Sequence, residues 1–206
     1  MVTVGRVTVG AGALLALASI FLFNDGAFFL AVVVAVACHE LGHYAALRFL
    51  KHRIVSLRLD IWGGDMRCDG RLSYSHEIIT AAAGPMASFL LAFLASQFGP
   101  SCRALFFLSG LSLVYGAFNI LPVQALDGGR MIYALTAQQR GLLAAERLTC
   151  VLSCGIIGLL LVAGVWLLIR THVNFTLLLV AVCLLISYCQ TGSVQVQSKG
   201  KNVGCV

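Results

Sequence analysis

The sequence predicts an all-α polytopic membrane protein of about six transmembrane helices with a small, cytoplasmic, membrane-associated β-hairpin. Hydrophobic residues make up 60% of the 206 residues, and charged residues make up only 11%. Soluble domains usually contain about 45–50% apolar residues, and the mean hydropathy here is +0.95. A soluble domain of this length could not bury so much apolar surface. The same composition excludes a disordered chain, a collagen, a coiled coil and a secreted disulfide scaffold.

The apolar runs mark candidate spans of roughly the 20 residues that a helix needs to cross a bilayer. The first run ends at the turn cluster Asn24-Asp25-Gly26. Arg6 and the apolar stretch after it are also compatible with a cleaved signal peptide, so the retention of span one stays open. The third run begins at Ser75, a candidate N-cap residue. We expect spans at 7–23, 27–50, 76–98, 103–123, 142–169 and 173–190.

The basic residues predict the orientation in the membrane. With six spans, the two termini and the loops 48–75 and 124–147 lie on one side. All of the 14 Lys and Arg residues except Arg103 and Arg170 fall on that side, which predicts cytoplasmic termini by the positive-inside rule. We expect an integral membrane protein, and we expect that membrane to be a bacterial cell membrane. The basic residues separate apolar runs and form no basic face, so no nucleic-acid partner is expected.

One polar loop differs from the others. From Val55 to Ile61, apolar and polar residues alternate, which is typical of a strand. We expect Gly63-Gly64 to supply a turn and residues 66–72 to return as a second short strand. The edge of such a hairpin stays unpaired unless something docks there.

The second span carries a metal-binding pattern, HExxH, at His39, Glu40 and His43. Residues four apart on a helix lie about 40° apart around its axis, so both imidazoles project from one face and can reach one zinc ion. Glu40 lies close enough to act as the general base of a metal-assisted hydrolysis. The alternative is a polar end of the span that binds no metal.

A catalytic zinc ion usually takes three protein ligands, and Asp127 is the candidate for the third. It follows the fourth span, after Pro122, which ends that helix, and before Gly128-Gly129, which let the backbone turn closely. Both segments approach the cytoplasmic side in the predicted topology, so the active site is expected there. The alternative is that Asp127 simply starts a cytoplasmic loop.

The motifs HELGH at 39–43 and NILPVQALDGG at 119–129 together resemble the paired signature of the site-2 proteases, which are intramembrane zinc metalloproteases. The segment Ala83-Gly84-Pro85 is similar to the glycine-proline segment of that family's third core span. The likeness covers about residues 27–135. The layout resembles the sporulation-protease branch, without the CBS or PDZ domain that other members carry.

The resemblance implies a role for each matching residue. His39, His43 and Asp127 would bind one Zn²⁺ per chain, and Glu40 would be the general base. Asn119 would hold substrate or stabilise the oxyanion. The resemblance also implies that the hairpin at Gly63 and Gly64 receives the substrate as an added strand.

The predicted function is therefore that of an intramembrane zinc metalloendopeptidase, which cleaves peptide bonds in or near transmembrane segments during regulated intramembrane proteolysis. We expect a single domain, 1–206, with the core at 27–135 and extra helices at 142–190. The expected partners are a transmembrane protein substrate and membrane lipid. A membrane regulatory partner and a homo-oligomer stay open.

An alternative function is a metal-binding membrane transporter or sensor, because an ion pathway also uses intramembrane His and Asp. A transporter has no need of Glu40 as a base, however. A pseudoprotease that binds membrane partners is a third alternative, against which the intact ligand set and base argue.

Overall fold

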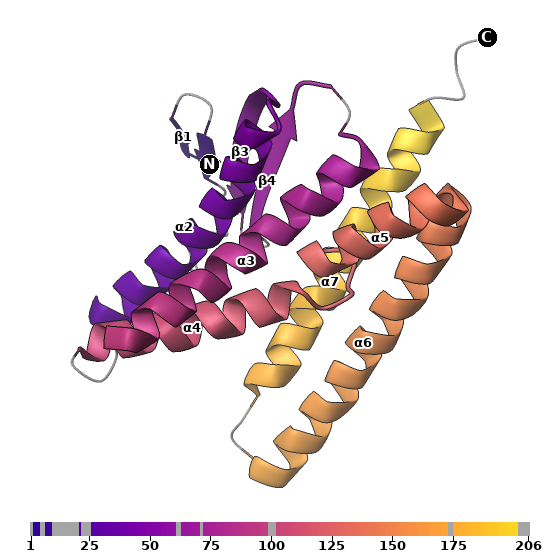
Figure 1. The fold of residues 1–206 in the computed structure, drawn as a ribbon. Helices are drawn as coiled ribbons and strands as arrows, with labels where there is room; N and C mark the ends of the chain where they lie inside the picture. The colour runs from indigo at the N-terminus through magenta and orange to yellow at the C-terminus, as the bar shows by residue number, and fades with distance from the viewer. Residues whose placement is uncertain are drawn as a thin grey trace. The chain divides into compact units, whose positions relative to one another are not determined.

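The computed structural model describes residues 2–4, 7–9, 21, 26–60, 63–70, 72–98, 102–172 and 175–201. The chain divides into two compact units, Met1–Ile120 and Leu121–Val206, and Figure 1 labels all of the elements named below except β2. In chain order, the first unit contains β1 (Val2–Val4), β2 (Val7–Val9), α2 (Gly26–Phe49), β3 (Ile54–Asp60), β4 (Gly63–Cys68), α3 (Tyr74–Phe98) and α4 (Arg103–Asn119), and the second contains α5 (Asp127–Arg140), α6 (Leu142–Thr171) and α7 (Thr176–Lys201).

Helices α2, α3 and α4 pack against one another and form the core of the first unit. Small residues bring α2 and α3 close together. A Cβ atom on Gly42 of α2 would lie 2.5 Å from the carbonyl oxygen of Ala83 and 2.8 Å from Cβ of Ala87. Such close backbone approach is typical of helix pairs in membranes. The buried face of α2 repeats every four residues, one turn apart, and consists of Ala31, Ala35, His39, His43 and Leu47.

The strands of the first unit form one sheet in the order β1-β2-β3-β4. Strand β2 runs parallel to β3, with Val7 opposite Leu57 and Val9 opposite Leu59. The prediction that a membrane span begins at residue 7 is therefore wrong, because Val7–Val9 form a strand. The alternative of a cleaved signal peptide falls largely on residues 10–20 and 22–25, which lie outside the described residues.

Strands β3 and β4 pair antiparallel. Strand β4 begins earlier than the sequence predicted, at Gly63. Gly63 and Gly64 do not form the turn, because they already pair with Asp60 and Leu59 in the ladder. The residues between the two strands, 61 and 62, are outside the described part of the chain.

The second unit contains a helix that the sequence analysis missed. Residues 124–147 were expected to form a loop, but Asp127–Arg140 is the helix α5. It ends at Gly141, where φ is +84°, a conformation that glycine adopts without strain. Helix α6 packs against both α5 and α7. A Cβ atom on Gly164 of α6 would lie 2.9 Å from the backbone of Leu178 on α7, so these two helices also meet at a small residue.

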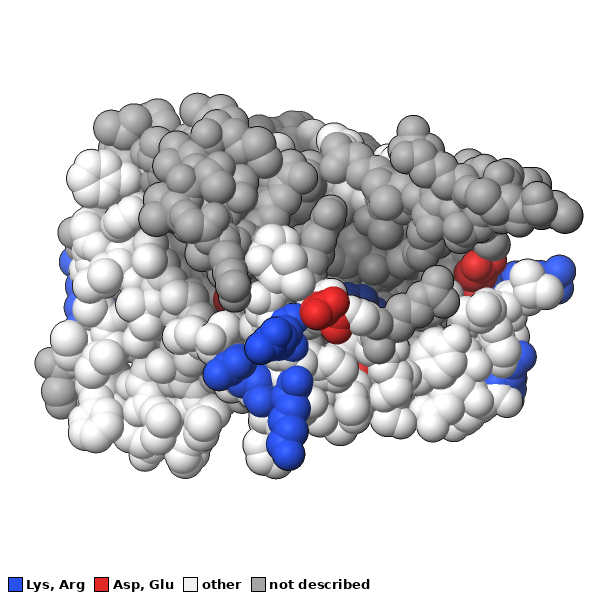
Figure 2. Space-filling view, turned by 90° about the horizontal axis from the view of Figure 1, so that it is seen from above, with Lys and Arg blue, Asp and Glu red and all other residues white. Residues whose placement is uncertain are grey.

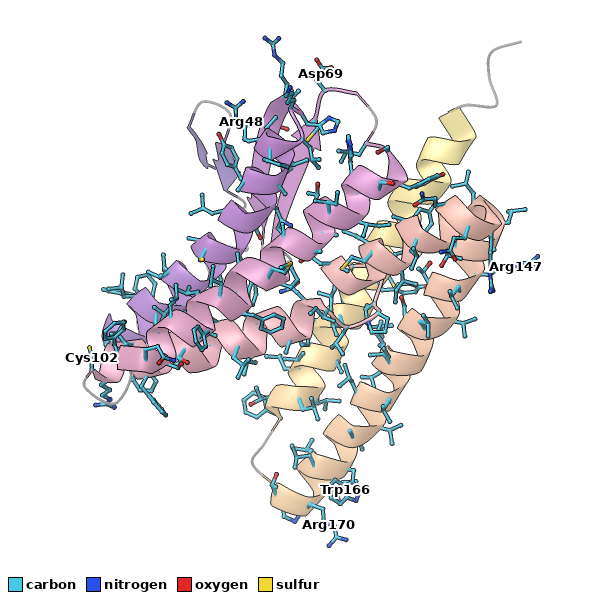
Figure 3. All side chains as sticks on the ribbon, viewed as in Figure 1. Arg48, Asp69, Cys102, Arg147, Trp166 and Arg170 are labelled. Atoms are coloured by element: carbon cyan, nitrogen blue, oxygen red, sulfur yellow. The ribbon has the colours of Figure 1, made fainter. Side chains whose placement is uncertain are left out.

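Three described helices, α2, α3 and α6, are long and apolar enough to cross a membrane, and α7 has a shorter apolar stretch at Thr176–Cys189. The described surface in Figure 2 is largely uncharged, with Lys and Arg gathered in a few groups. In Figure 3, Arg147 lies near one end of α6, and Trp166 and Arg170 lie near the other. The Arg170 guanidinium lies 5.6 Å from the ring centroid of Trp166. Such paired aromatic and basic residues are typical of the ends of a span.

Candidate metal centre

His39 and His43 lie one turn apart on the buried face of α2, where they are 2% and 6% exposed. The two Nε2 atoms are 3.2 Å apart. Two nitrogens that each lie about 2.0–2.1 Å from one tetrahedral zinc ion are about 3.3 Å apart. The observed separation therefore fits a pair of imidazoles that could bind the same ion.

Each imidazole also has a partner on α3 for its other nitrogen. Nδ1 of His43 donates to the backbone carbonyl of Thr80 at 2.8 Å. Nδ1 of His39 lies 2.9 Å from the hydroxyl oxygen of Ser88. A carbonyl only accepts hydrogen bonds, so Nδ1 of His43 carries the proton, and the neutral form of this ring has its lone pair at Nε2. This is the arrangement that metal-binding histidines use.

The space beside the two rings exists because position 84 has no side chain. A Cβ atom on Gly84 would collide with Nε2 and Cε1 of His43 and would lie 2.8 Å from Nε2 of His39. Pro85 follows within α3. The glycine-proline segment that the sequence analysis identified by resemblance thus has a physical role, which is to bring the backbone of α3 against both imidazoles.

Glu40 follows His39 on α2 and is half-buried, as a base beside the metal ligands would be. Asn119 is buried at the end of α4, where its amide nitrogen donates to the backbone carbonyl of Tyr115 at 3.0 Å. The ring of Tyr115 stands edge-on to His39, with centroids 4.8 Å apart. Sequence reasoning missed Tyr115, and its spacing of one turn from Asn119 was the only available signal.

Asp127 is the first residue of α5 and is 6% exposed. It therefore starts a helix and not a loop, and the positive end of the helix dipole favours its carboxylate. Its Oδ1 lies 3.5 Å from a guanidinium nitrogen of Arg130. A Cβ atom on Gly129 would collide with the carbonyl oxygen of Val123, so the tight turn before α5 requires glycine at this position.

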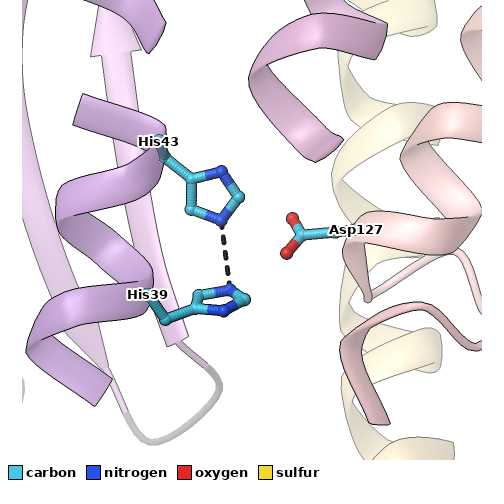
Figure 4. A group of neighbouring side chains, drawn as sticks. All are labelled: His39, His43 and Asp127. Carbon is cyan, nitrogen blue, oxygen red and sulfur yellow. Dashed lines mark hydrogen bonds between the residues drawn. The ribbon is translucent and has the colours of Figure 1, made fainter. Parts of the chain in front are cut away.

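Figure 4 shows the three predicted ligands, His39 and His43 from α2 and Asp127 from α5. These are residues that could hold a metal ion, the two histidines from the first unit and Asp127 from the second. A donor set of two imidazoles and one carboxylate suits a catalytic zinc ion, which keeps its fourth position open. Gly63 and Gly64 lie in β4, and their expected contact with substrate stays a prediction.

Comparisons with known proteins show similarity to peptidases. Residues 95–163 match the model of Peptidase family M50. The chain is 30% identical over 127 residues to a zinc metalloprotease of Methanocaldococcus jannaschii, a match that covers 58% of this chain and 37% of that protein. It is 31% identical over 127 residues to stage IV sporulation protein FB of Bacillus subtilis, covering 58% and 43% of the two chains. These matches span less than half the length of either relative.

A solved structure, the site-2 protease from Methanocaldococcus jannaschii, has the same fold. The TM-score is 0.70 at 22% identity, and the match covers 92% of this chain and 93% of that one. The sequence matches and the shared fold together confirm that the chain is similar to the site-2 proteases of Peptidase family M50.

Proposed function

We propose that this chain is an intramembrane zinc metalloendopeptidase, which hydrolyses peptide bonds in or near transmembrane segments of membrane proteins. The observation that carries the proposal is the pair of buried Nε2 atoms, 3.2 Å apart on an apolar helix, with Glu40 beside them. Buried ionisable residues in a membrane helix are costly, which favours a functional role for them. The similarity to the site-2 proteases supports the same function.

In the proposed mechanism, His39, His43 and Asp127 would hold one zinc ion. A zinc ion held there would supply a Lewis acid that polarises the scissile carbonyl and makes water more acidic. Glu40 accepts the proton of the attacking water and delivers it to the leaving amine. Asn119, at the end of α4, would bind the substrate or stabilise the oxyanion.

The substrate must be extended before it can be cut, because a helix hides its own peptide bonds. Strand β4 is the last strand in the order of the described sheet, so its outer edge is suited to pairing with an extended chain. We propose that the segment around Gly63 and Gly64 holds the unwound substrate in this way. Glycine or proline within the substrate span would ease the unwinding.

The location follows from the same proposal. The chain is an integral membrane protein, for which we propose a bacterial cell membrane, cytoplasmic termini, a cytoplasmic β-hairpin and an active site toward the cytoplasm.

We propose one protease domain with its core at 27–135 and extra helices at 142–190. Its role would be regulated intramembrane proteolysis, and a membrane regulatory protein or a second copy of the chain would be its partner. The alternative of a transporter or sensor is not favoured, because the similar proteins are named as proteases.

The test is the substitution Glu40→Gln in the full chain, reconstituted in liposomes with a library of tagged transmembrane segments. Loss of a general base lowers the rate by about 10²–10⁴-fold, while the zinc content should stay the same because the ligands remain. Glu77→Gln, in the first turn of α3, is the matched control and should cleave like the wild type. Full cleavage by Glu40→Gln would contradict the mechanism. Zinc transport that survives Glu40→Gln, without cleavage by the wild type, would favour a transporter.

A further inference from the structure

We propose that Ser88 of α3 is a positioning residue of the metal centre. Its hydroxyl group holds the imidazole of His39 so that Nε2 of that ring lies beside Nε2 of His43, where both could bind a metal ion. This inference rests on the proposed zinc site, but it concerns the affinity of the site for metal and not the cleavage of peptides.

The contacts between α3 and the histidines follow a simple order. Thr80, Gly84 and Ser88 are spaced one turn apart on α3. The carbonyl of Thr80 accepts from His43, Gly84 lies against both rings, and the hydroxyl of Ser88 reaches His39. Three successive turns of one helix therefore line the two metal ligands. Ser88 is 0% exposed, so water does not compete for its hydrogen bond.

The two histidines differ in the kind of partner that orients them. The carbonyl of Thr80 is an acceptor only, and it allows His43 a single neutral tautomer. The hydroxyl of Ser88 can accept from Nδ1–H of His39, which leaves Nε2 of that ring for a metal ion, or it can donate to an unprotonated Nδ1. Ser88 contacts His39 through its side chain, whereas Thr80 contacts His43 through its backbone. A side-chain substitution can therefore remove the hydrogen bond of Ser88 but not that of Thr80.

Helix α4 keeps Ser88 in place. A Cβ atom on Gly116 of α4 would lie 2.9 Å from Cβ of Ser88 and 3.1 Å from the ring of Phe89. The backbone of α4 therefore packs closely against this part of α3 and restricts any movement of Ser88 away from His39. The absence of a side chain at position 116 allows this close contact.

The simpler interpretation is that Ser88 is only a small residue where two membrane helices pack closely. Ser112 of α4 is the matched comparison, because it is also fully buried in the first unit. Among the described residues, its hydroxyl has no hydrogen-bond partner. Substituting either serine by alanine removes the same atom, but only at position 88 does the substitution take a hydrogen bond from a metal ligand.

The experiment uses the purified full chain in detergent micelles, without any peptide. Zinc affinity is measured by competition with a chelator for the wild type, Ser88→Ala, Ser88→Thr and Ser112→Ala. Loss of a hydrogen bond to a metal-binding histidine typically lowers metal affinity by about 10–100-fold, and we expect this for Ser88→Ala. Ser112→Ala should match the wild type. Ser88→Thr keeps the hydroxyl and should lie closer to the wild type than Ser88→Ala does.

A second readout is the downfield N–H proton of His39 Nδ1 in ¹⁵N-edited NMR spectra of the zinc-loaded protein. This signal should be sharp in the wild type and in Ser112→Ala, and it should shift or be lost in Ser88→Ala. Circular dichroism confirms that each variant is folded. If Ser88→Ala misfolds, Ser88→Thr and the wild-type NMR signal still decide the question, because a wild-type His39 without a protected Nδ1–H would overturn the proposal.

Two further outcomes would overturn the proposal. One is unchanged zinc affinity and an unchanged His39 signal in Ser88→Ala. The other is an equal loss of affinity in Ser112→Ala, which would point to helix packing in general. Because no peptide is present, a loss of affinity in Ser88→Ala alone would support the role of Ser88 even if the wild type cleaves nothing. Cleavage by the wild type with unchanged affinity in Ser88→Ala would overturn the role of Ser88 alone.

Discussion

Gly84 lies directly against the imidazole of His43. A Cβ atom at position 84 would collide with two atoms of this ring and would come within 2.8 Å of Nε2 of His39. The face of α2 that carries His39 and His43 and the backbone of α3 are therefore fitted to each other at a single glycine. Even one methyl group at this point would occupy the space in which both Nε2 atoms lie.

We expect Gly84→Ala to abolish zinc binding, measured as zinc per chain after dialysis. Alanine is favoured over glycine in a helix by about 1 kcal/mol, so a loss of zinc would reflect the collision with His43 and not a weaker helix. Gly110→Ala on α4 is the matched control, since a Cβ atom there would meet no atom within 4 Å. It should keep its zinc. Equal zinc contents in the two variants would contradict the fit between α2 and α3.

Asp127→Ala should lower the zinc affinity strongly, because a catalytic zinc ion usually needs three protein ligands. The control is Asp69→Ala, which removes an exposed carboxylate after β4 and should bind zinc like the wild type. Chelator competition measures both. If Asp127→Ala binds zinc with unchanged affinity, the third ligand is a different residue.

His52 and His76 form a second pair of histidines, with Nε2 of His52 2.9 Å from Nδ1 of His76. We expect this pair to be structural, since it joins the chain after α2 to the first turn of α3. His52→Ala should therefore leave zinc per chain unchanged and lower the free energy of unfolding by about 1 kcal/mol, the usual contribution of one hydrogen bond. His39→Ala is the comparison and should lose zinc. A loss of zinc in His52→Ala would refute this assignment.

Gly164 of α6 lies against the backbone of Leu178 on α7. Gly164→Leu should force these helices apart and lower the temperature of thermal unfolding in detergent, because membrane helices pack through small residues. Gly158→Leu adds the same side chain to the same helix where a Cβ atom would meet no atom within 4 Å. The unfolding temperature of Gly158→Leu should stay near that of the wild type. Equal decreases would show that Gly164 is not a packing contact.

The sequence predicted the elements that apolar length and periodicity define. The spacing of His39 and His43 sufficed to place both rings on one face of a helix, because helix geometry alone fixes this relationship. Helix α5 was missed because a helix of 14 residues with this many polar side chains is not predicted as a membrane span. The pair Gly128-Gly129 was expected to let the backbone turn after Asp127, but it lies in the first turn of α5, and Gly129 packs against Val123 in the turn before the helix.

The residues that hydrogen-bond to His39 and His43 could not be predicted either, because they are distant in the sequence. Ser88 and Thr80 are 49 and 37 residues from the rings that they contact, and only the packing of α3 on α2 brings them there. His52 stands between Lys51 and Arg53, a pattern that is typical of a solvated basic cluster. It is instead partly buried against His76, which again depends on the meeting of two helices.

The backbone carbonyl that orients His43 has a consequence for mutational scanning. Thr80 contributes its main chain to His43, while its own hydroxyl is buried without a hydrogen-bond partner among the described residues. A scan that replaces side chains leaves the carbonyl of residue 80 unchanged, so Thr80→Ala should register as tolerated. A residue that supports the metal site would then be scored as dispensable, and a backbone ester at the Thr80–Ala81 linkage, which weakens that carbonyl as an acceptor, would reveal its contribution.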